Sequence, residues 1–106
     1  MEYLKRIKKL LEDRNINYVI FINPLQEEVC SALQELDSYK LFIDWKEKLK
    51  ILFPDIIDWS YSKYSARDYF MENDPFHYKP ETGKLFLNEI MDNIGFNMAA
   101  ELKRKV

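Results

Sequence analysis

The sequence predicts an α/β fold built from helices and a parallel sheet. Stripes of apolar residues at helical spacing recur along the chain of 106 residues. Two runs of β-branched and aromatic residues lie between these stripes, with little of the polar alternation that a half-exposed strand would have. Helices that alternate with buried strands indicate a layered arrangement around a parallel sheet. The length fits one domain, which we expect to span residues 1–106.

The first half of the chain contains three expected helices and one strand. The strand covers residues 18–22, and Asn23 and Pro24 end it. A helix precedes it over residues 2–14, with an apolar face made of Leu4, Ile7, Leu10 and Leu11. Two helices follow, with stripes made of Leu25, Val29, Leu33 and Leu36 and of Leu41, Trp45, Leu49 and Leu52. The last of them should stop at Phe53, because Pro54 disfavours helical geometry in the residue before it.

The second half begins with a short strand over residues 55–59. Residues 60–73 lack a clear period and are expected to form a loop with a helical turn. Pro80 and Glu81 open the last clear helix, since proline suits the first helical position and a carboxylate complements the dipole there. Its expected apolar face is Gly83, Leu87, Ile90 and Ile94. The tail, residues 96–106, is predicted to be helical.

Two strands are too few for an independent sheet. A two-stranded parallel sheet leaves both edges unpaired and is marginally stable at best. We therefore expect the sheet to be completed by further sequence, by another chain or by strands that the pattern does not reveal.

Composition excludes several classes of protein. The net charge of -2 argues against a dedicated nucleic-acid binder, and a short basic cluster in the first helix (Lys5, Arg6, Lys8 and Lys9) is typical of a solvated face. The single cysteine, Cys30, cannot form an internal disulfide and is expected in the core rather than as a nucleophile. No signal peptide or membrane span is recognisable, so the chain is expected to be soluble and, on its own evidence, cytoplasmic.

The only histidine, His77, follows Asp74 by three residues on a predicted loop before a helix. In nucleophilic hydrolysis, a histidine takes the proton of a serine hydroxyl and an aspartate fixes the histidine tautomer. A local role is the alternative, in which Asp74 caps a turn and His77 packs near the helix start. The spacing alone leaves both open.

The sequence around this pair, Asp-Pro-Phe-His-Tyr-Lys-Pro-Glu-Thr-Gly at residues 74–83, resembles the last motif of the SGNH (GDSL-like) hydrolases. It is most similar to a His-Tyr-x-Pro-Glu-x-Gly form found in bacterial cell-surface and D-alanine-transfer-related proteins. The resemblance implies that Asp74 is the orienting acid and His77 the general base of a catalytic triad. It also implies that Gly83 and Leu87 pack the final helix on the sheet.

The resemblance implies the C-terminal half of a larger hydrolase domain, with a partial three-layer α/β/α, flavodoxin-like fold. The family's Gly-Asp-Ser nucleophile motif is missing, as are its oxyanion glycine and its Gly-x-Asn-Asp motif. Whether the chain is an enzyme therefore stays open, and alone it should be inactive or nearly so. The assembled domain would act as an esterase or acyltransferase on an ester-linked small molecule or glycan, without a cofactor.

A non-catalytic interaction module is the second hypothesis, in which the open sheet edge binds a partner or a second copy. The aromatic residues of the stretch 59–78 would then either cover the end of the sheet or offer a ligand surface. A metal site that combines Glu72 with Asp74 and His77 is a poor third, because the sequence offers too few strong ligands. No metal is expected.

Overall fold

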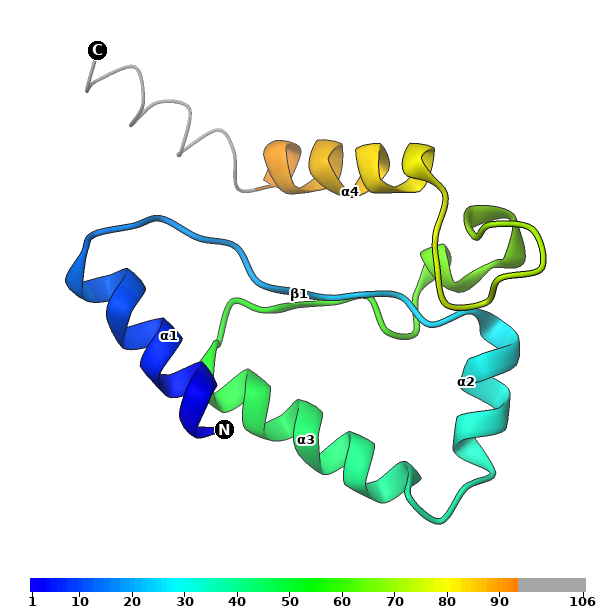
Figure 1. The fold of residues 1–106 in the computed structure, drawn as a ribbon, viewed down its shortest axis with the longest axis horizontal. Helices are drawn as coiled ribbons and strands as arrows, with labels where there is room; N and C mark the ends of the chain where they lie inside the picture. The colour runs from blue at the N-terminus through cyan, green and yellow to red at the C-terminus, as the bar shows by residue number, and fades with distance from the viewer. Residues whose placement is uncertain (94–106) are drawn as a thin grey trace.

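The computed structural model describes residues 1–93, which form four helices and a two-stranded parallel sheet (Figure 1). The predicted α/β content is confirmed. The predicted helical tail and Ile94 lie outside the described residues. The elements in chain order are α1 (Glu2–Asp13), β1 (Phe21–Ile22), α2 (Glu27–Gln34), α3 (Tyr39–Leu52), β2 (Ile57–Asp58), two 3-10 turns (Lys63–Ser65 and Arg67–Tyr69) and α4 (Pro80–Asn93).

The two strands pair where the sequence placed them, but over fewer residues than expected. Phe21 lies opposite Ile57 and Ile22 opposite Asp58. The backbone N–H of Ile57 donates to the Ile20 carbonyl at 3.0 Å, and the N–H of Trp59 donates to the Ile22 carbonyl at 3.2 Å. The paired segment therefore covers the last two residues of the first predicted run and residues 57–58 of the second.

The helices lie on both sides of the strands. In Figure 1, α1 and α3 lie on one side and α4 on the other, while α2 lies beyond the carboxyl end of β1. An aromatic cluster of Trp59, Tyr64 and Phe86 fills the space on the α4 side, with Phe21 and Tyr78 packed against it. The rings of Trp59 and Phe86 stack with centroids 4.5 Å apart. Such pairs add about 0.5–1.5 kcal/mol to the stabilisation from burial alone. The aromatic residues after β2 therefore cover the sheet.

Two helix faces differ from the expected ones. On α4, Thr82 and Phe86 are each 2% exposed, whereas Leu87 is 64% exposed. The face that packs on the sheet thus runs through Phe86, and the placement of Leu87 against the sheet is wrong. Gly83 does lie close to the core, since a Cβ there would be 3.6 Å from the Tyr78 ring. On α3, only Leu49 of the predicted stripe is fully buried, and Leu41 and Trp45 are exposed.

The outer edge of β1 has no neighbouring strand among residues 1–93. Ile20 and Ile22 bond to β2, so by parallel-sheet geometry the N–H and C=O of Phe21 point to the opposite side. The molecule is also extended, with a radius of gyration of 16.2 Å, where a compact domain of this size has about 13 Å. Within the described part, α1 has no fully buried residue. These features are typical of a sheet that lacks its next strand.

We expect amide hydrogen exchange to report this open edge. At low protein concentration, the Phe21 amide should exchange faster than the amides of Ile57 and Trp59, because only the latter two donate within the sheet. Exchange measured by NMR, residue by residue, tests this. A Phe21 amide as protected as that of Ile57 in the monomer would contradict an open edge.

None of the helices formed by residues 1–93 has the length and apolar character needed to cross a bilayer.

Candidate functional site

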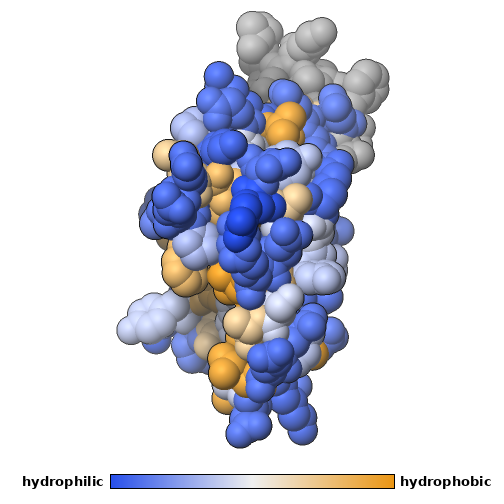
Figure 2. Space-filling view, turned by 90° about the vertical axis from the view of Figure 1, so that its right-hand side faces the viewer, coloured by the Kyte–Doolittle hydropathy of each residue, from blue (hydrophilic) through white to orange (hydrophobic). Residues whose placement is uncertain are grey.

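The predicted Asp-His pair lies on a closed loop beyond the carboxyl end of the strands, at the same end of the molecule as α2 (Figure 1). Two backbone bonds close this loop, from Met71 N–H to the His77 carbonyl and from Lys79 N–H to the Tyr69 carbonyl, both 2.9 Å long. The carboxyl end of parallel strands is where α/β proteins commonly bind ligands. Figure 2 views this end directly and shows a largely hydrophilic surface with small apolar patches.

The structure brings Asp74 and His77 into direct contact. The Oδ2 atom of Asp74 lies 2.8 Å from Nδ1 of His77. The other carboxylate oxygen, Oδ1, accepts the backbone N–H of Phe76 at 3.1 Å. Asn73 has a left-handed backbone (φ 59°), a conformation that asparagine tolerates, and it turns the chain just before Asp74. Local turn chemistry thus presents the carboxylate to the imidazole.

The bond from Phe76 and, after it, the contact with His77 lower the pKa of Asp74 below its ordinary value. Asp74 is therefore a carboxylate at neutral pH, as an orienting acid must be. The bond from Phe76 also means that Asp74 caps a turn. The same position of the Asp74 carboxylate suits both roles considered from the sequence, the cap of a turn and the orienting acid of a triad. Neither role excludes the other.

The second nitrogen of His77 is available to a reactant. The His77 side chain is 76% exposed, and no group within residues 1–93 is bonded to its Nε2. The three serines that follow β2 are not free on the surface beside His77. Ser60 is 1% exposed and Ser65 is 4% exposed, and the Ser62 side chain caps a 3-10 turn. Within residues 1–93, Nε2 of His77 is therefore exposed, and no serine hydroxyl is hydrogen-bonded to it.

We expect neutral His77 to carry its proton on Nδ1, because only a protonated Nδ1 can donate to Asp74. Since His77 is the only histidine, the ¹⁵N chemical shifts of its ring can be assigned without ambiguity. These shifts, recorded with the imidazole neutral, should identify Nε2 as the unprotonated nitrogen. The Asp74→Ala variant should shift the balance toward the Nε2-protonated form. An Nε2-protonated ring in the unmodified chain would contradict the contact.

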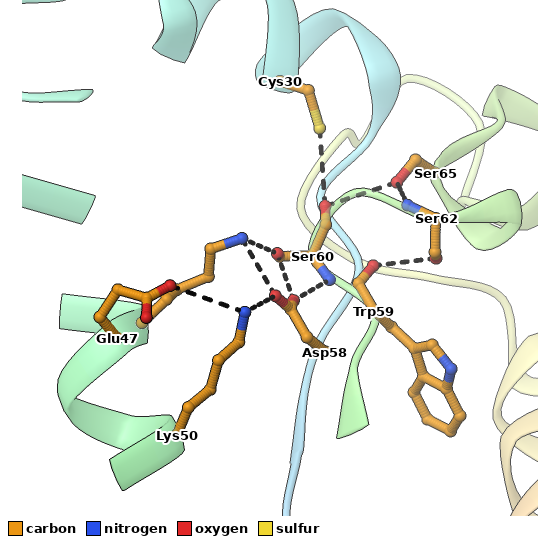
Figure 3. Close-up of polar contacts among 9 residues, drawn as sticks. Cys30, Glu47, Lys50, Asp58, Trp59, Ser60, Ser62 and Ser65 are labelled. Atoms are coloured by element: carbon orange, nitrogen blue, oxygen red, sulfur yellow. Dashed lines mark hydrogen bonds and ion pairs between the residues drawn. The ribbon is translucent and has the colours of Figure 1, made fainter. Parts of the chain in front are cut away.

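A second polar cluster, which sequence reasoning missed, lies at the end of β2 (Figure 3). Asp58 accepts a bond from Nζ of Lys46 at 3.0 Å, and Nζ of Lys50 lies 3.7 Å away. Lys46 also donates to the Ser60 hydroxyl at 3.1 Å. The side chains of Lys46 and Asp58 are 14% and 21% exposed. This network ties α3 to the carboxyl end of the sheet, which suits a structural role.

Cys30 joins the same region from α2. Cys30 is 4% exposed, and its thiol lies 3.6 Å from the Ser60 carbonyl oxygen. Burial raises the pKa of the Cys30 thiol, which disfavours the reactive thiolate. The expectation that Cys30 is a core residue is confirmed.

The Asp58 network should make stability depend on pH. Burial alone would raise the pKa of Asp58, but the bonds from Ser60 and Lys46 outweigh it, so that the pKa is lowered. A lowered pKa gives stabilisation that is present above the ordinary carboxyl pKa of about 4 and is lost as the pH falls through the folded value. Urea unfolding of Asp58→Asn should therefore lose part of the pH dependence below about pH 4 that the parent chain has. Identical acid profiles would contradict this role.

Metal-ligating side chains do not gather around the loop. Among residues 1–93, no three of the histidine, cysteine, aspartate and glutamate side chains are grouped as a metal site would require. Glu72 is thus not assembled with Asp74 and His77 into a ligand set.

Comparisons of the chain with protein-family models, curated proteins and solved structures find no match. The resemblance to the SGNH hydrolases therefore stays a prediction from the sequence of residues 74–83.

Proposed function

We propose that this chain is the C-terminal part of an SGNH-type serine esterase or acyltransferase and supplies the Asp-His pair of its triad. The observation that carries the proposal is the 2.8 Å contact between Asp74 and His77, with the remaining ring nitrogen of an exposed imidazole unbonded within residues 1–93. Its position beyond the carboxyl ends of parallel strands and the motif at residues 74–83 support it. Helices on both sides of the sheet suit a partial three-layer, flavodoxin-like domain.

In this reaction, Nε2 of His77 takes the proton of a serine hydroxyl as the serine oxygen attacks the ester carbonyl. Asp74 stabilises the imidazolium that forms. The imidazolium then gives its proton to the departing alcohol, which leaves an acyl-serine. Water or an acceptor hydroxyl attacks this acyl-serine in turn, with His77 again accepting and returning the proton.

The serine must come from a polypeptide segment outside this chain, because no serine here has the family's Gly-Asp-Ser context. The oxyanion donors must come from the same source. A triad depends on all its members, so the chain alone should have little activity. The open edge of β1 is where a further strand of the assembled domain would pair.

A fluorophosphonate probe, which labels activated serines, tests the proposal. The chain should be expressed alone and together with the polypeptide encoded directly upstream of the Met1 codon. We expect labelling of a serine in that second polypeptide, only when both are present and only with an intact His77. Labelling that persists in His77→Ala would refute the catalytic role. An unrelated or untranslated upstream sequence would leave the second hypothesis as the better one.

The second hypothesis, a non-catalytic interaction module, is favoured by one specific observation. The outward N–H and C=O of Phe21 lie on an edge that is unpaired in the described residues. A strand from a second copy or from a partner would satisfy them. Sedimentation over a range of concentrations separates the two hypotheses. A dimer that protects the Phe21 amide favours the module, and a monomer at high concentration counts against self-association.

A further inference from the structure

The apolar face of α1 is largely uncovered within residues 1–93. Leu4 and Leu11 are half-buried, but Ile7 is 47% exposed and Leu10 is 49% exposed. A surface helix of a globular protein normally turns such a stripe toward the core. The exposed stripe therefore indicates that α1 extends over a part of the sheet that the described residues do not supply.

A groove of about 440 Å³ lies where α1, β1 and α3 meet. Its wall is mostly apolar and includes Leu4, Phe21, Phe42 and Trp45. Trp45 is 43% exposed. The same strand, β1, presents the outward N–H and C=O of Phe21, which are unpaired within the described part of the chain. An occupant must therefore offer both backbone hydrogen-bonding groups and apolar side chains, as a β-strand does.

The positions of α1 and α3 determine where the strand before α1 would lie. The connection from β1 through α3 to β2 is a parallel crossover, and such crossovers are right-handed in about 98% of cases. Both helices lie on the same side of the strands, and each runs back toward the start of the strand that follows it (Figure 1). Two right-handed crossovers on one side of a sheet advance across it in the same direction. Since the crossover through α3 advances from β1 to β2, a crossover through α1 must reach β1 from its outer edge.

We propose that the outer edge of β1 and the adjoining groove hold a β-strand that is joined to the amino end of α1 and runs parallel to β1. In this arrangement α1 covers the added strand and β1 together, which buries the stripe containing Ile7 and Leu10. The strand's side chains on the α1 side fill the groove, so its sequence should be a β-branched run like that of residues 18–22. It should end about 2–6 residues before Glu2, the usual length of such a connection.

This inference goes beyond the hydrolase proposal, because a strand at this edge requires neither His77 nor a serine. It also differs from self-association. A second copy related by a two-fold axis would place its β1 antiparallel to this one, so the direction of the added strand distinguishes the two occupants.

A designed strand joined to the full chain tests the proposal. The segment Val-Thr-Val-Ile-Val-Thr, followed by the connection Gly-Asn-Gly-Ser, is placed directly before Met1. The matched control has Pro-Pro in place of the central Val-Ile, because proline has no N–H to donate to a sheet. Exchange of the Phe21 amide should be slower by at least about tenfold with the strand than with the control. NOE contacts between the strand and residues 20–22 should show parallel pairing.

Tryptophan fluorescence reports on the groove separately. The chain has two tryptophans, and Trp59 is only 5% exposed, so quenching by acrylamide reports mainly on Trp45. The added strand should reduce this quenching, and the proline control should leave it unchanged.

Equal protection of the Phe21 amide by the proline control, or antiparallel contacts, would overturn the proposal. Protection that appears in the unextended chain and grows with protein concentration would also overturn it, since a second copy would then occupy the edge. If the extended chain does not fold, the same segment is added to the unextended chain as a separate peptide. The proposal fails if that peptide leaves the Phe21 amide unprotected. These measurements involve no catalytic step, so their outcome is separate from that of the proposed activity.

Discussion

Replacing Phe86 with alanine is expected to lower the free energy of unfolding by about 3–5 kcal/mol, the usual cost of removing a buried aromatic side chain. Phe86 is 2% exposed and lies at the centre of the aromatic cluster. Its ring centroid lies 4.5 Å from that of Trp59 and 4.9 Å from those of Tyr64 and Tyr78. The substitution would leave a cavity between α4 and the sheet and would remove these ring contacts. Urea unfolding followed by circular dichroism measures the loss.

Leu87→Ala is the matched control, because it truncates an apolar side chain at the next position of the same helix. With Leu87 64% exposed, the change should alter the free energy of unfolding by at most about 0.5 kcal/mol. Equal losses in the two variants would mean that α4 packs through the face containing Leu87, as its spacing first indicated. The arrangement of the aromatic cluster would then be wrong.

In the assembled hydrolase that we propose, Asp74→Asn should reduce kcat by about 10³- to 10⁴-fold, as expected when the acid of a serine triad is neutralised. Asparagine is nearly the same size, so the turn is retained. It offers His77 an amide in place of the carboxylate that holds the Nδ1 proton and stabilises the imidazolium. The reaction then loses both the correct tautomer and the charge that balances its transition state.

Steady-state kinetics on an ester substrate of the assembled protein test this expectation. A fall in kcat with little change in KM would mean that a transition-state interaction is lost rather than substrate binding. Glu72→Gln, which neutralises an exposed carboxylate of the same loop, should leave the rate near that of the parent protein. If Asp74→Asn retained the full rate, Asp74 would have only the structural role of capping a turn.

The order and type of the elements could be predicted from local pattern alone. Apolar periodicity located all four helices of residues 1–93, and Pro54 correctly placed the end of α3 at Phe53. The faces that pack could not be predicted in the same way. Phe86 and Leu87 are adjacent and both apolar, so only the position of the sheet decides which one is buried. The predicted strands were too long because the length of a paired segment also depends on a tertiary neighbour: pairing ends where the partner strand ends.

The Asp-His pair could be predicted because its geometry is local, within four consecutive residues. The Asp58 network could not, since it joins a strand to a helix through tertiary contact. One signal was nevertheless present. Lys46 occurs at helical spacing from Phe42 and Leu49, so that it shares a face with apolar residues of α3. A lysine on such a face indicates that an acidic partner lies within reach.

The placement of the single thiol has a practical consequence. Because Cys30 is buried where α2 meets the residues after β2, a thiol reagent can reach it only when α2 separates from the end of the sheet. Its labelling rate is therefore a built-in measure of local opening at this end of the protein, without any engineered probe. Pairing along the outer edge of β1 acts elsewhere on the sheet and should leave this rate unchanged.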